Sequence, residues 1–467
     1  MTPRTDPWVL LKFGGTSVST PDCWETIAKI LRERISEGFR PLVVCSALSQ
    51  VSNQLEDGLV DALLGREPSG FVDALRERHR RLAADLGLEP DDEQIEAEVA
   101  RLDERLTGVS MLREASPRVE AEILSAGEML STRIGAAWLE KQGLSTRWLD
   151  ARTLLSAEDH GDDRSRQYLS ADCGPGTDPE LAGCLSGHAE AVLLTQGFVA
   201  RAPDGGTALL GRGGSDTSAT LLAERLRAHH VEIWTDVAGL FSADPRVAPD
   251  AQRVERLGFD ETMELTTRGA KVLHPRSLAP ARRAGVPIHV RCTRDPVSPG
   301  TLIDEEHGLE LPSAVAISSR RGMTVVVMDV ERSWQEVGVI AEVAACFARQ
   351  GLSIDSISSS QRRVNVSLDP SANSLDEETV SRLIADLERY SEPQVVSGVA
   401  SVSIVGAHLQ RALRGLPSLL DALEERRVYL LAHAANDHSL TFVIDEEDLD
   451  DVVRRLHRDL LRSRDAA

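Results

Sequence analysis

Short apolar runs alternate with amphipathic helical patterns from Trp8 to about Pro296, and this alternation constrains the fold more than any other feature of the sequence. The run VLLKF, the helix-like segment CWETIAKILRERISEG and the run PLVVCSAL make the first such unit. Strands that alternate with helices are typical of βα units around a mostly parallel sheet. We therefore predict an α/β fold in which helices sandwich a mostly parallel open sheet.

Later apolar runs at 190–200, 231–237 and 286–290 predict further strands of the same sheet. Each is apolar on both sides, as buried parallel strands tend to be. Residues 54–115 are different, because they are rich in Glu, Arg and Leu at helical spacing and contain no convincing strand. They predict a mostly helical lobe inserted between elements of the sheet.

The segment 294–313 is rich in proline, glycine and acidic residues, which marks a domain boundary. The sequence after it repeats, because 323–390 and 400–461 both show the order βαββα at similar length. In the first unit, Ser374 and Glu377 fit a capping box at the start of the last helix. The alternative to a repeat is a single second α/β domain.

Length and charge narrow the function classes. A chain of 467 residues suggests two to three domains. The formal net charge of -22 argues against a nucleic-acid or acidic-membrane surface, since such faces need a basic excess over a whole domain. A small anionic substrate is compatible with it, because that needs only a few local cations.

The cysteines and the N-terminal residues bear on location. The six cysteines lack CxxC spacing, so they predict neither a disulfide framework nor a zinc site. No apolar run approaches the roughly 18 residues of a membrane helix. The start, MTPRTDP, has no apolar signal core. We expect reduced cysteines and a cytoplasmic protein.

A first glycine cluster, FGGTS, follows the first predicted strand directly and stands beside Lys12. Gly14 and Gly15 would let the backbone approach a ligand with its N–H groups, and Lys12 would add a mobile positive charge. That combination suits a polyphosphate. Alone, a tight turn between strand and helix explains the glycines equally well.

A second cluster, at 212–216, precedes an amphipathic helix that we expect to begin near Thr217. Free N–H groups and the positive end of the helix dipole would face this loop. Arg212 offers a planar fork suited to a carboxylate or phosphate. The alternative is an ordinary N-cap by Ser215 or Asp216.

A third cluster, at 233–247, has polar and turn-forming residues after a strand. In open parallel sheets, ligands bind beyond the carboxyl ends of the strands, where all three clusters are expected. Glu128 stands near the start of an apolar helix, as a solvated helix-start charge or as a partner for an ammonium group. By itself Lys271 would be a surface lysine, and His274 a structural residue before a proline.

Together, six blocks in this order resemble the aspartate kinases of the amino-acid-kinase family, and the repeated tail resembles the paired ACT modules of those enzymes. The resemblance covers nearly the whole chain. The blocks are KFGGTSV (12–18), SAGEMLS (125–131), TQGF (195–198), GRGGSDTSA (211–219), WTDVAGLFSADPR (234–246) and GAKVLHP (269–275).

The resemblance implies an amino-acid-kinase domain over 1–300 and two ferredoxin-like βαββα ACT modules over 314–395 and 396–467, with a strand near 314–330 that the modules could share. It implies transfer of the γ-phosphoryl group of ATP, with Mg²⁺, to the β-carboxylate of L-aspartate. The product would be 4-phospho-L-aspartate, the first intermediate on the way to lysine, threonine and methionine. A homo-oligomer, at least a dimer through the ACT modules, and an amino-acid effector are also implied.

Residue roles follow from the matching positions. The resemblance implies catalytic roles for Lys12 and Asp216, and no residue is expected to bind a metal directly. The positions implied to bind aspartate are Ser46, Ser52, Glu128, Arg212, Gly213, Gly214 and Ser215. Those implied to bind the nucleotide are Lys12, Phe13, Gly14, Gly15, Thr235, Asp236, Phe241, Arg246 and Lys271. Those implied to bind the effector are Asp355, Ser360 and Gln361.

The chain departs from the family pattern at several positions. Phe241 replaces the usual tyrosine, Ser52 a threonine, and Gln50 a common glycine at the rim of the aspartate site. Gln361 stands where lysine-sensitive forms have glutamate, and two arginines follow it, so we expect a weak response to lysine or a different effector.

Two alternatives stay open. One is a kinase of the same fold that acts on another acid, such as glutamate or acetylglutamate. The pairing of Glu128 with Arg212 argues against it, because that pair suits a free amino acid. The other is a non-catalytic amino-acid sensor, against which Lys12, Arg212, Asp216 and Lys271 argue.

Overall fold

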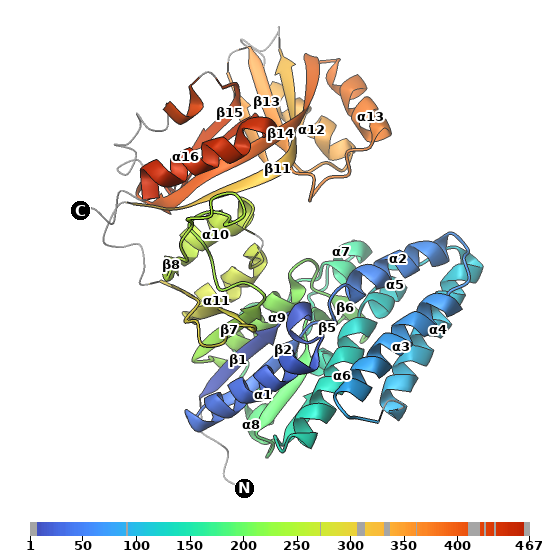
Figure 1. The fold of residues 1–467 in the computed structure, drawn as a ribbon. Helices are drawn as coiled ribbons and strands as arrows, with labels where there is room; N and C mark the ends of the chain where they lie inside the picture. Colours follow the sequence, from blue (N-terminus) through green and yellow to red (C-terminus); the bar gives the residue numbers. More distant parts are fainter. Residues whose placement is uncertain are drawn as a thin grey trace. The chain divides into compact units, whose positions relative to one another are not determined.

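The computed structural model describes residues 7–89, 92–270, 272–305, 313–330, 337–360, 362–409, 421–424, 426–433 and 436–461 (Figure 1). The chain forms two compact units. The first contains 1–240, 255–259 and 271–307, and the second contains 241–254, 260–270 and 308–467. The domain limits predicted from the sequence remain predictions, and the compact units divide the chain differently, because 241–254 and 260–270 cluster with the C-terminal part.

An eight-stranded sheet organises the first unit, with the strand order β3-β4-β2-β1-β7-β9-β10-β8. All neighbours are parallel except β9 and β10, which confirms the predicted mostly parallel sheet. The strands are β1 (Trp8–Phe13), β2 (Arg40–Cys45), β3 (Thr146–Leu149), β4 (Val192–Gln196), β7 (His230–Thr235), β8 (Arg256–Gly258), β9 (Ile288–Cys292) and β10 (Thr301–Asp304). A separate hairpin is made by β5 (Val199–Arg201) and β6 (Thr207–Leu209).

The helical lobe predicted between sheet elements is present and is confirmed. Its helices pack against one another beside the sheet, as Figure 1 shows in blue and cyan. They are α2 (Val51–Leu63), α3 (Ser69–Asp85), α4 (Glu93–Leu112), α5 (Pro117–Leu124) and α6 (Ala126–Lys141). The other helices of this unit are α1 (Pro21–Ser36), α7 (Arg164–Leu169), α8 (Pro179–Ser186), α9 (Gly214–Leu226) and α11 (Leu278–Ala284).

The two faces of β1 have different neighbours. Val9, Leu11 and Phe13 belong to the apolar core shared with α1 and the helical lobe. Side chains alternate along a strand, so Leu10 and Lys12 point to the opposite face, and α9 packs against β1. The single lysine of this buried strand is thereby directed toward the start of α9.

The second unit contains a six-stranded antiparallel sheet with the order β12-β13-β11-β14-β16-β15. Its two central strands are long and pair along their whole length. The strands are β11 (Ser313–Asp329), β12 (Ser356–Ser359), β13 (Arg363–Leu368), β14 (Glu392–Ala407), β15 (Val428–His433) and β16 (Ser439–Asp445). The helices are α10 (Phe259–Thr267), α12 (Val339–Arg349), α13 (Glu377–Leu387) and α16 (Leu449–Leu461).

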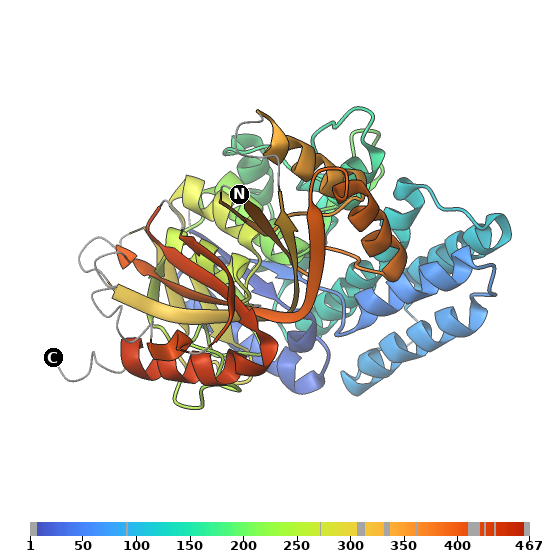
Figure 2. The same cartoon turned by 90° about the horizontal axis from the view of Figure 1, so that it is seen from above.

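Both long strands bend near their middles, and Figure 2 shows the orange strand β14 curving along its length. Gly322 and Gly398 take left-handed backbone angles there, with φ of 69° and 73°. The pairing register of β11 with β14 shifts between Arg320 and Met323. The first half of β11 therefore belongs with β14, β16 and β15, while its second half lies between β13 and β14.

The elements of both predicted repeats are found in their predicted order, except that half of the residues expected to form the first helix of the second repeat, 416–427, lie outside the described residues. The capping box at Ser374 is wrong. The N-cap of α13 is Asp376, whose side chain accepts a hydrogen bond from the Thr379 backbone N–H. Both positions offer a side-chain oxygen, and the helix uses the one directly before its first turn.

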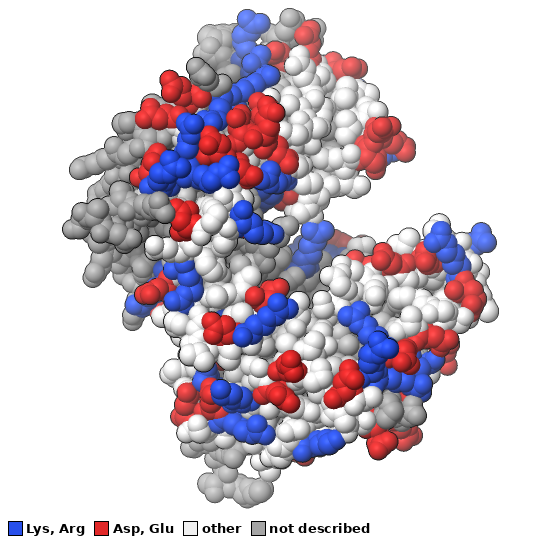
Figure 3. Space-filling model, viewed as in Figure 1, with Lys and Arg blue, Asp and Glu red and all other residues white. Residues whose placement is uncertain are grey.

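Acidic and basic side chains are intermixed on the face seen in Figure 3. None of the six cysteines is in a disulfide. Among the described residues, the helices are all too short or too polar to cross a membrane.

Two helical glycines predict opposite effects of the same substitution. A Cβ on Gly135 of α6 would collide with the Trp24 ring of α1, whereas one on Gly108 of α4 would meet nothing within 4 Å. We expect Gly135→Ala to cost about 1 to 3 kcal/mol of unfolding free energy through overpacking. Gly108→Ala should gain about 0.5 to 1 kcal/mol, because alanine is the better helix former. Chemical denaturation of both variants measures this, and a loss at Gly108 or a gain at Gly135 would contradict the packing described.

Candidate active site

Lys12 and Asp216 form an ion pair where β1 ends and α9 begins. Lys12 Nζ lies 2.6 Å from Asp216 Oδ1, and only 12% and 10% of the two side chains are exposed. Asp216 is in the first turn of α9, close to the positive end of the helix. The structure thus brings together the two residues with predicted catalytic roles in a nearly dry position.

The loop after β1 needs a glycine at position 15. A Cβ on Gly15 would lie 2.8 Å from the Ala47 carbonyl oxygen, which is too close for any side chain. A Cβ on Gly14 would lie 3.5 Å from Lys12 Nζ, which is ordinary van der Waals contact. The Gly14 N–H points to the Trp234 carbonyl at 3.2 Å, and Ser19 Oγ donates to the Gly15 carbonyl at 2.6 Å. The loop is therefore held close to Lys12 by the backbone of β7 and by its own serine.

Phe13 does not offer its side chain to a nucleotide. The ring is fully buried and stacks on Trp234 with the centroids 6.1 Å apart, on the face opposite Lys12. Its carbonyl oxygen accepts a hydrogen bond from the Ser46 N–H at 3.1 Å. The predicted contact to a nucleotide is left without a free group on Phe13, because alternation along β1 turns its ring into the core.

The start of α9 differs from the sequence prediction. The helix begins at Gly214, not near Thr217, and its N-cap is Gly213 without a side-chain hydrogen bond. The alternative of an N-cap by Ser215 or Asp216 is therefore wrong. Gly213 is left-handed, with φ of 66°, and a Cβ there would collide with His274. The glycines let the helix start directly beside the ends of the strands.

Serine hydroxyls connect this helix start to the loop after β2. Ser46 Oγ donates to Ser215 Oγ at 3.0 Å, and Ser131 of α6 donates to the Ser46 carbonyl at 2.7 Å. Ser52 is half-buried in the first turn of α2. Gln50, just before it, has φ of 67°, a left-handed conformation that favours glycine. The glycine usual at this position is explained by the backbone, and Gln50 keeps that conformation.

Glu128 is buried in α6 with one unpartnered oxygen. Only 3% of the residue is exposed, and Oε2 has no hydrogen-bond partner among the described residues. Burial raises the pKa of Glu128 to about 8, although backbone hydrogen bonds from Ala47 and Glu128 lower it. The reading as a solvated helix-start charge is wrong. A buried carboxyl group with a free oxygen is suited to an ammonium ligand.

Arg212 is exposed at the mouth of the same loop. Burial, together with the charges of Arg276 and Arg212, lowers the pKa of His274, while Asp216 opposes this shift. His274 Nδ1 accepts from the Arg276 N–H at 3.3 Å, in keeping with its predicted structural role.

The remaining nucleotide positions are distributed over the chain. Thr235 and Asp236 follow β7 in the first unit, where Thr235 Oγ1 donates to Asp236 Oδ1 at 3.2 Å. Phe241 and Arg246 belong to the second unit, and the Arg246 side chain is 89% exposed beside Asp244. Lys271 lies outside the described residues.

Two supporting contacts escaped sequence reasoning. Arg276 donates to the Leu210 carbonyl at 2.9 Å and to Asp172 at 2.7 Å, which holds the strand end before Arg212. Ser17 and Thr293 share a buried hydrogen bond of 2.7 Å. Ser17 ends the first glycine cluster, but its partner Thr293 and the residues Arg276 and Asp172 stand outside the glycine clusters, so only their positions in space reveal these contacts.

The predicted effector residues lie in the second unit. Asp355 does not present a free carboxylate, because Arg320 donates to Oδ1 at 3.1 Å and Ser367 donates to Oδ2 at 3.2 Å. Ser360 Oγ accepts from the Arg363 N–H at 3.2 Å. Gln361 lies outside the described residues.

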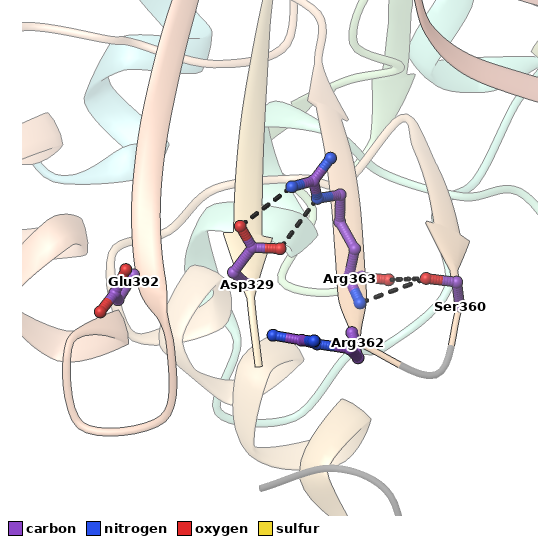
Figure 4. A pocket seen from close by; sticks show the side chains of 5 residues that line it. All are labelled: Asp329, Ser360, Arg362, Arg363 and Glu392. Carbon is purple, nitrogen blue, oxygen red and sulfur yellow. Dashed lines mark hydrogen bonds and ion pairs between the residues drawn. The ribbon is translucent and has the colours of Figure 1, made fainter. Parts of the chain in front are cut away.

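Ser360 also lines a pocket of about 420 Å³ together with Asp329, Arg362, Arg363 and Glu392. Figure 4 shows Arg363 turned onto the Asp329 carboxylate, to which it donates at 2.9 and 3.0 Å. This hydrogen bonding lowers the pKa of Asp329. The Arg362 side chain extends beneath Asp329 toward the strand that carries Glu392. The expected repulsion of a cationic effector by the two arginines therefore applies mainly to Arg362.

Comparison with known proteins adds independent support. The sequence profile described as "Amino acid kinase family" matches residues 7–292. Lysine-sensitive aspartokinase 3 of Escherichia coli is 32% identical over 461 residues, covering 97% of this chain and 99% of the relative. Chloroplastic aspartokinase 1 of Arabidopsis thaliana is 28% identical, covering 98% of this chain and 80% of the relative.

Solved structures agree. The crystal structure of E. coli aspartokinase III with aspartate and ADP is 32% identical, has a TM-score of 0.79 and covers 97% of this chain and 99% of its own. The structure of that enzyme with lysine and aspartate also has a TM-score of 0.79, at 31% identity. The chain belongs to the amino acid kinase family. Within it, the chain is an aspartokinase with a C-terminal regulatory region, as the sequence predicted.

The buried carboxyl group predicts a pH-dependent affinity for the amino acid. A positively charged ammonium group needs the ionised form of Glu128, whose pKa is about 8. The KM for aspartate should therefore fall as pH rises toward 8, by up to about tenfold per pH unit. Steady-state kinetics between pH 6 and pH 9 would measure it, and a flat profile would refute it.

Glu128→Gln supplies the control. Its KM for aspartate should be high and independent of pH in this range.

The pH dependence of stability has the opposite sign: rising pH favours aspartate binding but lowers the stability contribution of Glu128. Because the folded-state pKa is raised, folding takes up a proton between the unfolded value near 4.5 and about 8. Glu128 therefore costs stability increasingly over that window, and Glu128→Gln should gain relative to wild type as pH rises through it.

Proposed function

We propose that the chain transfers the γ-phosphoryl group of ATP to the β-carboxylate of L-aspartate and so forms 4-phospho-L-aspartate. The observation that carries the proposal is the Lys12–Asp216 pair, which sets one cation beside the loop after β1 and the first turn of α9. The buried Glu128 adds a carboxyl group for the ammonium of a free amino acid.

The chemistry needs positioning and charge neutralisation more than acid–base help. Two anions, a carboxylate and a triphosphate, must meet in line. Lys12, the Gly15 N–H and the start of α9 would stabilise the charge that spreads over the transferred group, whereas the Gly14 N–H is already donated to the Trp234 carbonyl. Asp216 orients the Lys12 ammonium through their 2.6 Å contact. The attacking carboxylate is already ionised at neutral pH, so no base is required.

The nucleotide and its metal fit these residues. Mg²⁺ bound to the phosphates would add positive charge where negative charge develops on the transferred group. This ion commonly keeps water and phosphate ligands and is rarely held by protein side chains alone. Among the described residues, no cluster of three or more His, Cys, Asp or Glu side chains could hold a metal ion by itself. Thr235 and Asp236, at the end of β7, would hold the nucleotide.

Selectivity for a free amino acid follows from Glu128 and Arg212. Glu128 would pair with the ammonium and Arg212 with the α-carboxylate, and an N-acylated acid has no positive charge to offset Glu128. A hydroxamate assay with ATP, Mg²⁺ and aspartate, glutamate or acetylglutamate tests the proposal. Aspartate should give the highest rate. Faster turnover of another acid would assign the chain to that acid, and no turnover would favour the amino-acid sensor.

We also propose that the chain forms a homo-oligomer through its C-terminal part and that it is cytoplasmic. The edge strands β12 and β15 carry the exposed apolar residues Ile357 and Leu431, at 41% and 52% exposure. Edges of this kind need cover. Light scattering at micromolar concentration tests for the oligomer.

Lys12 is predicted to act in the transition state. Lys12→Ala should lower kcat by roughly two orders of magnitude or more, because it removes the cation that meets the transferred group. Arg212→Ala should instead raise the KM for aspartate, since its partner is the non-reacting carboxylate. The control is Lys29→Ala on the exposed side of α1, which should leave both parameters unchanged. An unchanged kcat in Lys12→Ala would remove Lys12 from the reaction.

The regulatory region is proposed to bind an amino-acid effector but to respond weakly to lysine. A lysine ammonium would have to displace Arg320 from Asp355, to which it is hydrogen bonded at 3.1 Å. An effector that reached Ser360 would also meet the positive charge of Arg362, which lines the same pocket.

Sub-millimolar lysine alone should therefore inhibit little. Arg362→Ala should strengthen inhibition by lysine about 2- to 5-fold, the range for one partly exposed charge. Arg382→Ala, on the exposed side of α13, is the matched control. Titration of lysine, threonine and methionine, singly and in pairs, into the kinase assay measures the response. Strong inhibition of the wild type by sub-millimolar lysine would contradict the proposal.

A further inference from the structure

The segment 241–254 carries two predicted nucleotide residues, Phe241 and Arg246, yet it packs inside the second unit. Ala243 and Ala248 are buried in the apolar core that α16 and the strands β14 and β16 form. Val247 and Ala251 pack against the same core. The preceding residue, Leu240, still belongs to the first unit, where its N–H donates to Thr301 Oγ1 at 2.9 Å. The chain therefore enters the second unit directly at Phe241.

Ser242, the residue after Phe241, holds the segment by hydrogen bonds on all its polar groups. Its backbone N–H donates to the Gln252 carbonyl at 2.8 Å, and its carbonyl accepts from the Ile317 N–H at 2.8 Å. Its hydroxyl accepts from the Gln252 N–H at 2.9 Å. The same hydroxyl lies 2.9 Å from Nε2 of His457 on α16.

His457 is suited to this contact. The residue is 2% exposed, and its other ring nitrogen, Nδ1, lies 3.7 Å from Asp250 Oδ1 in the same segment. With the Nδ1 proton turned toward that carboxylate, Nε2 is the acceptor for the Ser242 hydroxyl. One side chain of the C-terminal helix thus contacts both ends of the segment, which returns to the first unit after Val254.

We propose that His457 is a positioning residue for the nucleotide, acting through Ser242 on the neighbouring Phe241 and on Arg246. The proposal rests on the function proposed above. A buried hydroxyl that loses its partner is costly, so the segment would shift to satisfy it, and the residues beside it would move with it. The last helix of the chain, more than 200 residues away in sequence, would in this way set the affinity for ATP.

The test compares Ser242→Ala, His457→Phe and the double variant. Calorimetric titration gives the Kd for ADP, and steady-state kinetics give KM for ATP, KM for aspartate and kcat. Each single variant should weaken ADP and ATP about 5- to 10-fold, as expected for one buried hydrogen bond. The double variant should be no weaker than the singles, because both remove the same contact. The KM for aspartate and kcat should change by less than about twofold.

His433→Phe is the matched control, because His433 lies on β15, where its Nε2 is 3.3 Å from Asp437 Oδ1, outside the segment 241–254. It should leave nucleotide affinity unchanged. A purely structural role of His457 would lower the melting temperature and the amount of active enzyme without changing the KM for ATP. If His457→Phe folds poorly, Ser242→Ala still distinguishes the positioning role from the structural role.

Unchanged ADP affinity in both single variants, or a double variant as weak as the product of the singles, would overturn the proposal. A wild type that binds ADP without turning over aspartate would refute the proposed function alone, and the ADP affinities of the variants would still decide the role of His457. A wild type that does not bind ADP would overturn both.

Discussion

The active-site part of this molecule depends on the ion pair between Lys12 and Asp216. Burying two charges is expensive, and the attraction between them offsets that cost only at close range. The structure meets this condition by ending β1 and starting α9 at the same place. Gly213 and Gly214 allow α9 to begin there, and Gly15 allows the loop after β1 to pass the Ala47 carbonyl. The glycines are thus needed to bring a lysine and an aspartate within 2.6 Å in a nearly dry position.

The carboxyl group of Glu128 is buried in a different way. Lys12 has an ion-pair partner in the structure, whereas one oxygen of Glu128 has no hydrogen-bond partner among the described residues. Gly127, next to it in α6, lies against Ala47 and Val51, and the helix comes closer to these residues than a side chain at position 127 would allow. A carboxyl group in this position favours a positively charged ligand, because burial outweighs the two backbone hydrogen bonds that stabilise its ionised form. Binding an amino acid and losing a proton are then one event.

The sequence predicted the sheet, the helical lobe and the glycine-rich turns after β1 and before α9, because apolar periodicity and glycines after strands are local signals. It placed the start of α9 three residues late, since Gly213 and Gly214 read as loop although the helix begins at Gly214. It did not predict that 241–254 would join the second unit, because alanines such as Ala243 and Ala248 look like loop residues until their burial is known. The pairing of Asp355 with Arg320, separated by 35 residues, also has no local signature.

The long strands β11 and β14 have a consequence for how the repeated region is built. Each runs through both halves of the sheet, so each half borrows a strand segment from the other. The two repeats are therefore interleaved like the subunits of a domain-swapped dimer, although they belong to one chain. Cutting the polypeptide between them would not release two modules, because each fragment would keep an unpaired sheet edge. The duplicated sequence thus folds as one cooperative body, and strain introduced in one repeat is shared by the backbone of the other.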